Sequence, residues 1–174
     1  MSRLVRVGRI VGFPNPVNEL AARVVAGAVA LVTVLTIVLG AVVAPGWLWL
    51  TAGLAYGFVA RVVTGPTLSP LGQLATRVVA PRLGAARLVA GPPKRFAQAI
   101  GATLTVLAVV LLAAGVRPGV YVLLGMLLAA ATLESVFGVC LGCRIFAVLM
   151  RVGLVPQETC AACANIALRD PQAA

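Results

Sequence analysis

The sequence predicts an all-α integral membrane protein, a four-helix bundle made of two transmembrane hairpins. Three observations lead to this class. Hydrophobic residues make up 61% of the 174 residues and charged residues only 10%, whereas soluble domains are about half apolar and a quarter charged. Four apolar runs approach the ~20 residues that cross a bilayer. The positive charges lie almost entirely on one side of these runs, as they do in membrane proteins.

The spans follow one another as two tight pairs within a single membrane domain. The first pair is expected at residues 24–44 and 47–63, joined at Pro45-Gly46, with Trp47 and Trp49 at the lipid–water interface. The second pair is expected at residues 97–115 and 120–142, joined by a short turn, with Tyr121 near its outer end. The connections inside each pair are short, so each pair is predicted to form an antiparallel hairpin.

The charges predict orientation and exclude several function classes. Of the 14 Lys and Arg residues, Arg117 alone falls in a turn between paired spans. The positive-inside rule therefore places both termini in the cytoplasm. The bias for Arg over Lys, with much Ala, Gly and Val, is typical of a GC-rich bacterial genome, so we expect a protein of the bacterial inner membrane. Because the charges follow the spans, a nucleic-acid partner is not expected. The absence of histidine and the presence of four acidic residues exclude His-based catalysis and carboxylate-rich metal sites.

Residues 64–95 are expected to form an interfacial amphipathic segment. Ser69 is a plausible N-cap followed by Pro70 at the first helical position, and Pro81 ends that helix. Arginines alternate with leucines in the remainder of the segment. Basic amphipathic segments lie in the membrane surface, so the bilayer and its anionic headgroups are the predicted partners. Residues 143–174 are expected to form a short cytoplasmic tail.

A weak internal repeat relates the two hairpins. Pro45-Gly46 and Pro118-Gly119 are separated by 73 positions (118 − 45), and the same shift carries Arg61 onto Glu134. Both hairpins enter from the same side, so the repeat is parallel. Isolated charges inside a membrane are costly and usually find a partner. We therefore predict an intramembrane ion pair between Arg61 and Glu134, direct or through water.

The cysteines carry the main chemical signal. They form two pairs, Cys140-x-x-Cys143 and Cys160-x-x-Cys163. Stable structural disulfides are disfavoured in the cytoplasm, whereas a thiol near an arginine or a helix N-terminus ionises readily. We interpret Cys140 and Cys143 as a reactive pair with Arg144 as the charge that stabilises the thiolate. Cys160 and Cys163 are then a relay to a soluble partner.

Two other functions stay open at this point. The spacing of all four cysteines (140, 143, 160 and 163) also suits a structural zinc site, which would tie the tail to the bundle without catalysis. Zinc is then the cofactor, and otherwise none is expected. A small transporter of an anionic sulfur compound, using Arg61 and Glu134, is the third hypothesis. Whether the protein is an enzyme stays open.

Four stretches together resemble a family of bacterial membrane proteins catalogued as domain of unknown function 4395. The resemblance covers about residues 10–150. It implies no established activity, but similar proteins are associated with thioredoxin-like and rhodanese-like sulfur proteins, which implies thiol or sulfur metabolism and a soluble partner of that kind. Cys160 and Cys163 lie beyond it. The stretches are Phe13-Pro14-Asn15-Pro16-Val17-Asn18-Glu19, Gly65-Pro66-Thr67-Leu68-Ser69-Pro70-Leu71, Pro92-Pro93-Lys94-Arg95-Phe96-Ala97-Gln98, and the run from Leu133-Glu134 to Cys140-Leu141-Gly142-Cys143.

Overall fold

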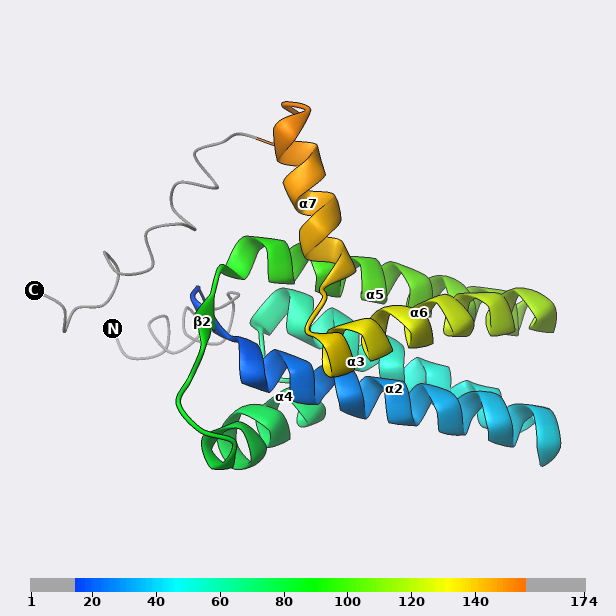
Figure 1. Cartoon of the computed structure of the whole chain (residues 1–174). Coiled ribbons are helices and arrows are strands. Elements are labelled where there is room, and N and C mark those ends of the chain that lie inside the picture. The colour runs from blue at the N-terminus through cyan, green and yellow to red at the C-terminus, as the bar shows by residue number, and fades with distance from the viewer. Residues whose placement is uncertain (1–14, 156–174) are drawn as a thin grey trace, which may run out of the picture.

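The computed structural model of the chain describes residues 15–155. This part of the chain has four long helices, and Figure 1 shows that they lie alongside one another. They are α2 (Glu19–Val42), α3 (Leu50–Thr64), α5 (Gly91–Ala113) and α6 (Arg117–Phe137). A 3₁₀ turn, η1 (Pro45–Trp49), leads directly into α3, so that Pro45–Thr64 forms one span of 20 residues. All four spans are long and apolar enough to cross a membrane, which confirms the all-α membrane bundle.

The four spans pack in a pattern that is the same for both hairpins. The largest contacts join α2 to α6 and α3 to α5, and exchanging the two hairpins leaves this pattern unchanged. The buried positions between helices hold mainly small or medium-sized residues, while many leucines and valines point outward. Buried hydroxyls of Thr33 and Thr36 donate to the carbonyls of Val29 and Val32, both at 2.7 Å. The outward apolar side chains are those expected to contact lipid.

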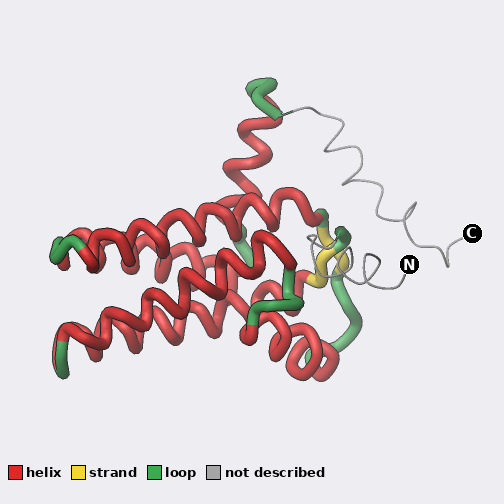
Figure 2. Tube along the Cα trace, turned by 180° about the vertical axis from the view of Figure 1, so that it is seen from behind, coloured by secondary structure: helices red, strands yellow, loops and turns green. Residues whose placement is uncertain are grey.

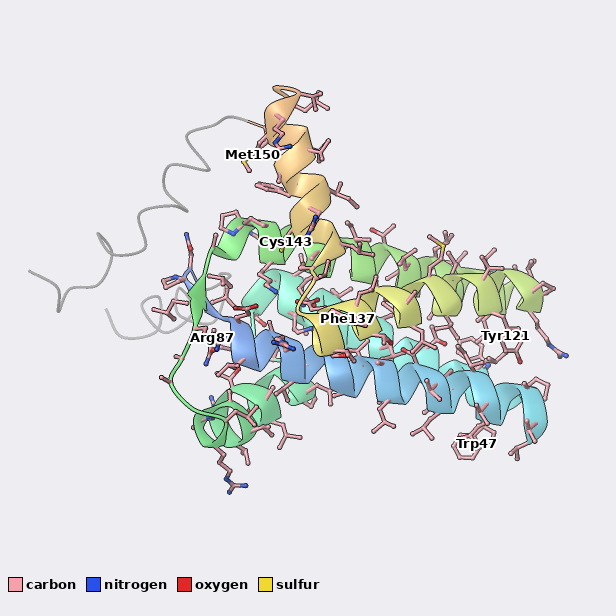
Figure 3. All side chains as sticks on the ribbon, in the orientation of Figure 1. Trp47, Arg87, Tyr121, Phe137, Cys143 and Met150 are labelled. Carbon is pink, nitrogen blue, oxygen red and sulfur yellow. The ribbon has the colours of Figure 1, made fainter. Side chains whose placement is uncertain are left out.

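The two ends of the bundle differ. Figure 2 shows the turns after α2 and after α5 together at one end, which we call the hairpin end. Figure 3 shows Trp47 and Tyr121 there, and Arg87 and Cys143 at the opposite end. We call this the α7 end, after a further helix, α7 (Leu141–Arg151). Among the described residues, Arg117 is the cation of the hairpin end. The separation of aromatic and cationic ends agrees with the pattern read from the sequence.

Three span boundaries differ from the prediction by five or more residues. The first span begins at Glu19 instead of residue 24, and the third begins at Gly91 instead of residue 97. Prolines are tolerated in the first helical turn, where backbone N–H groups lack partners anyway, so Pro92 and Pro93 open α5 and do not delay it. The fourth span ends at Phe137 instead of residue 142. The first two shifts lengthen the helices α2 and α5, and the third leaves residues 138–140 outside any helix.

A short ribbon ties the two hairpins together at the α7 end. Strand β1 (Val17–Asn18) pairs antiparallel with β2 (Leu88–Val89). Asn18 caps α2 by accepting from the Leu20 N–H at 3.0 Å. Asn15 accepts from the Gly91 N–H at 3.1 Å and so satisfies the start of α5. The Asn-Pro-Val-Asn stretch thus joins the N-termini of two spans.

The segment between the hairpins folds against the bundle. It contains α4 (Pro70–Leu74), a π-helical turn η2 (Ala75–Val79) and a 3₁₀ turn η3 (Ala80–Arg82). The Ser69 hydroxyl accepts from the Gly72 N–H at 3.2 Å, as expected of an N-cap. Ala75 and Ala80 are buried, whereas Arg77 and Arg82 are exposed. The segment is thus amphipathic, but the predicted range of 64–95 is too long, because β2 and the first turn of α5 occupy its last residues. Its position in the membrane surface stays a prediction.

Candidate functional site

The Cys-x-x-Cys sequence forms a turn and the start of a further helix, α7 (Leu141–Arg151). Gly138 ends α6 with φ +68°, a backbone conformation that favours glycine. Cys140 is the N-cap residue of α7, and Cys143 lies in its first turn. The sequence analysis placed this pair at the end of span four. The structure instead places it between the span and a separate helix that leaves the bundle sideways (Figure 1).

An arginine from another span holds the end of α6. Arg23 of α2 donates from Nη2 to the carbonyls of Ser135 at 3.1 Å and Val136 at 2.9 Å, and its Nε donates to Ser135 at 3.3 Å. The last carbonyls of a helix have no partners within the helix, and a cation there is favourable. Arg23 therefore positions the turn that carries the cysteines.

Helix α7 is fixed to α5 by a close backbone contact. A Cβ added at Gly142 would lie 2.5 Å from the Cα of Ala97, which is too close for any side chain. Phe146, one helical turn further on, packs against Phe96 with ring centroids 5.6 Å apart. The glycine between the two cysteines is thus required by packing. It lets the first turn of α7, and Cys143 with it, lie directly on α5.

The residues of α7 divide among three faces. Gly142 and Phe146 form the packed face. The apolar side chains of Leu141, Ile145, Val148 and Val152 follow helical spacing and are exposed. The third face lines an open cleft of about 620 Å³ with Cys143, Ala147 and Arg151. An exposed apolar stripe beside a basic face is typical of a helix that lies in the membrane surface.

The two thiols lie together in this cleft. The structure describes Cys140 as buried, Cys143 as half-buried and both as free cysteines. The hydrogen bond from the Cys143 thiol lowers the pKa of Cys140, and the Lys94 ammonium acts in the same direction against burial and the Glu134 carboxylate. The hydrogen bond to Cys140, together with burial, raises the pKa of Cys143. The pair therefore divides into one thiol that ionises readily and one that holds its proton.

Lys94, and not Arg144, is the cation that favours ionisation of these thiols. Arg144 is exposed and lines the same cleft, and its backbone N–H donates to the Cys140 carbonyl at 3.1 Å. Lys94 reaches the thiols because α5 begins early and lies beneath α7. The sequence analysis missed this role because it placed Lys94 in the loop before span three.

Glu134 is also paired with Lys94. The Lys94 ammonium donates to the Glu134 carboxylate at 2.7 Å, and the two side chains are 9% and 14% exposed. The direct form of the predicted contact between Arg61 and Glu134 is therefore not formed, and their pairing through water stays a prediction. Helix α5 contacts both α3, which carries Arg61, and α6, which carries Glu134. It therefore supplies a separate polar partner to each of these two charges.

Arg61 takes its partners from α5 and from the segment between the hairpins. Its Nε donates to Gln98 Oε1 at 2.8 Å, and its Nη1 donates to the Ser69 hydroxyl at 3.1 Å. The guanidinium carbon lies 4.4 Å from the centre of the Phe58 ring, a favourable cation–π distance. Lys94 and Gln98 are four residues apart on α5, so they lie on one face. Arg61 and Glu134 still line a common cavity.

Lys94, Gln98 and Arg23 are the residues of this site that the sequence analysis did not single out. The first two belong to the Pro92–Gln98 stretch that carries the family resemblance. In that stretch, Lys94 and Gln98 are four positions apart, and this helical spacing could have predicted that both side chains lie on one face of a helix. Nothing local marks Arg23, because its partners lie 112 and 113 residues away in the chain.

Cys160 and Cys163 lie outside the described residues, so their roles as relay or zinc ligands stay predictions. Within residues 15–155 no group of three or more Cys, His, Asp or Glu residues could hold a metal ion. Cys140 and Cys143 would supply two zinc ligands, and a four-thiolate site needs both tail cysteines as well.

Fold and site together define an integral membrane helical bundle with a thiol pair at the start of a separate helix, α7, at one end. The chain belongs to the family described as "Domain of unknown function (DUF4395)", whose model matches residues 17–151. The match begins at strand β1 and ends with α7, so it covers every span and both cysteines of the site. No curated protein and no solved structure is significantly similar to the chain.

Proposed function

We propose that the protein performs thiol–disulfide exchange or sulfur transfer at the cytoplasmic face of the bacterial inner membrane. Its partner would be a soluble protein of the thioredoxin-like or rhodanese-like kind. The observation that carries this proposal is the difference between two thiols in one cleft. The pKa of Cys140 is lowered and that of Cys143 is raised. A purely structural pair has no need of this asymmetry.

The exchange step follows from the geometry. The Cys140 thiolate attacks one sulfur of the partner's disulfide, an S–S bond forms between the two proteins, and the partner's second sulfur leaves as a thiolate. Cys143 then loses its proton and attacks the Cys140 sulfur, which closes an intramolecular disulfide and releases the reduced partner. The reverse sequence reduces the Cys140–Cys143 disulfide. With a persulfide partner, Cys140 would instead accept the terminal sulfur atom.

The open cleft supports access by a soluble partner. It is about 620 Å³ in volume and is lined by Arg144 and Arg151 as well as the thiols. Cations at the rim of a site favour encounter with an acidic partner surface. The exposed apolar stripe of α7 would keep the helix, and with it the cleft, at the membrane surface.

A trapping experiment tests the proposal. The full chain, with Cys160 and Cys163 replaced by serine, is mixed in detergent with a thioredoxin-like probe whose own resolving cysteine has been replaced. Cys143→Ser should accumulate a mixed disulfide through Cys140, because the resolving step is missing. Cys140→Ser is the matched control and should trap little. Equal trapping by the two variants, or none by Cys143→Ser, contradicts the proposed roles.

Zinc analysis of the unmodified protein separates the exchange function from the structural alternative. Stoichiometric zinc, with all four thiols protected from alkylation until a chelator is added, would favour the zinc site. Uptake of an anionic sulfur compound into vesicles would favour the transporter.

The proposed orientation has its own test. An impermeant thiol reagent should label Cys160 and Cys163 in opened membranes and not in intact cells. Labelling in intact cells would move the site to the other side of the membrane and remove the cytoplasmic partner.

A further inference from the structure

A second cavity lies inside the bundle, on the membrane side of α7. Its volume is about 230 Å³ and its walls come from α2, α3, α5, α6 and α7. Most of the lining is apolar. Four functional groups interrupt it, namely Arg61, Gln98, Glu134 and Cys140. A mainly apolar pocket with a few polar groups is the usual form of a small-molecule site.

Two hydrogen-bond donors at this cavity lack acceptors. Arg61 is only 5% exposed, and its Nε and Nη1 are bonded to Gln98 and Ser69. Within residues 15–155, its Nη2 has no hydrogen-bond acceptor, and neither has the Gln98 amide nitrogen. Neither nitrogen is fully buried, because among the described residues Thr51 Oγ1 is the one buried side-chain polar atom without a partner. Both nitrogens are therefore accessible from the cavities that Arg61 and Gln98 line. The cavity thus suits a ligand that brings acceptor oxygens.

The charge of the cavity favours a neutral ligand. Its lining contains one cation, Arg61, and one anion, Glu134, and Glu134 is already paired with Lys94. A fatty acid or another anionic headgroup would bring a second negative charge close to the Glu134 carboxylate. A carbonyl oxygen accepts the same hydrogen bonds without adding that charge.

The rim of the cavity faces lipid. Met126, Leu141 and Ile145 line it and are 54%, 41% and 46% exposed. Such side chains on a membrane-spanning surface contact acyl chains, so a ligand would enter from the bilayer. The volume is below the ~300–1,000 Å³ of pockets that enclose a whole drug-sized ligand. It leaves room for a ring, with an apolar tail remaining among the lipids.

Cys140 lines both this cavity and the open cleft. A thiol that is reached from the lipid side and from the aqueous side can pass electrons between them. We propose that the cavity binds the ring of a lipid-soluble quinone, which oxidises the Cys140–Cys143 dithiol. This inference rests on the proposed exchange function and identifies the lipid-side electron acceptor.

The reaction balances as a two-electron transfer. Cys140 and Cys143 together lose two electrons and two protons, and an S–S bond forms between them. The quinone takes up the two electrons and two protons at its carbonyl oxygens and leaves as the hydroquinone. Arg61 and Gln98 bind a carbonyl oxygen and stabilise the negative charge that develops there. A soluble dithiol then reduces the new disulfide by exchange.

The test uses the purified full chain, reduced and free of oxygen, with Cys160 and Cys163 replaced by serine. The probe is a benzoquinone with a decyl chain and a fully substituted ring, which blocks direct addition of thiols. Loss of quinone absorbance should match one Cys140–Cys143 disulfide formed per chain. Cys140→Ser and Cys143→Ser should each abolish it.

Arg61→Leu, Arg61→Lys and Gln98→Leu examine the binding groups, and Arg117→Leu at the hairpin end is the matched control. The Arg61 variants should slow quinone reduction about tenfold or more, since a hydrogen bond from a charged donor is worth about that factor. Arg61→Lys retains the charge and loses Nη2, so it reports the donor itself in case Arg61→Leu folds poorly. Arg117→Leu should react at the original rate.

Disulfide exchange with the thioredoxin-like probe is measured on every variant. Exchange that persists without quinone reduction overturns the quinone inference and leaves the proposed function intact. If the chain that retains Cys140, Cys143, Arg61 and Gln98 shows no disulfide exchange with the probe, the proposed function itself is overturned. Quinone reduction that is unchanged in Arg61→Lys and Gln98→Leu, or that is suppressed by a long-chain fatty acid more strongly than by a redox-inert quinone analogue, overturns the assignment of this cavity.

Discussion

Removing Lys94 should destabilise the bundle more than removing Lys94 and Glu134 together. The two charges are 2.7 Å apart and largely buried. At that separation and an effective dielectric constant of about 20, their gross attraction is about 6 kcal/mol, from which the cost of desolvating both groups must be subtracted. Lys94→Met leaves Glu134 buried without its partner, and breaking a buried pair in this way costs about 3–5 kcal/mol.

The double variant Lys94→Met/Glu134→Gln removes the orphaned charge. Replacing both members of a buried pair is often close to neutral, so the double variant should recover most of the stability lost by Lys94→Met. Glu134→Gln alone should lie between them, because the amide oxygen can still accept a hydrogen bond from Lys94.

The free energy of unfolding of each variant is measured by denaturant titration in mixed micelles with circular dichroism. Arg117→Met is the control for loss of an exposed positive charge and should stay within about 0.5 kcal/mol of the parent. Additive losses, with the double variant less stable than either single one, would refute the assignment of Lys94 as the partner of Glu134.

Three further predictions concern the dithiol turn. Because its pKa is lowered, Cys140 should be alkylated at lower pH than an ordinary thiol, while Cys143, whose pKa is raised, should react only at higher pH. Mass spectrometry of each labelled cysteine across pH checks this order, and the opposite order contradicts the assigned roles. Gly142→Ala places a methyl group 2.5 Å from Ala97 and should cost about 1–3 kcal/mol, with faster proteolysis of α7; unchanged stability would mean that α7 is not held against α5. Arg23→Leu should lose about 1–3 kcal/mol through the uncapped carbonyls of α6, with increased hydrogen exchange at the turn, whereas Arg23→Lys should retain part of the protection.

The cysteine turn shows where inference from the sequence stopped short. The pattern of two cysteines at helical spacing indicated sulfurs on one side, and the structure does place both in one cleft. It also suggested Arg144 as their cation, since that residue is adjacent in the chain. Adjacent residues on a helix point in different directions, so the cation was supplied by Lys94, 46 residues before Cys140 in the sequence.

The sequence alone determined the class of protein, the two hairpins and the Ser69 cap of the segment between them. Hydropathy, charge asymmetry and capping depend on the local sequence, so their structural consequences do not depend on which helices pack together. Tertiary structure decided which charges met. Arg61 and Glu134 occupy matching positions in the repeat, but α5 lies between their spans and offers Gln98 to one and Lys94 to the other. A buried charge pairs with the nearest group that satisfies it, and only the packing of three helices establishes which group that is.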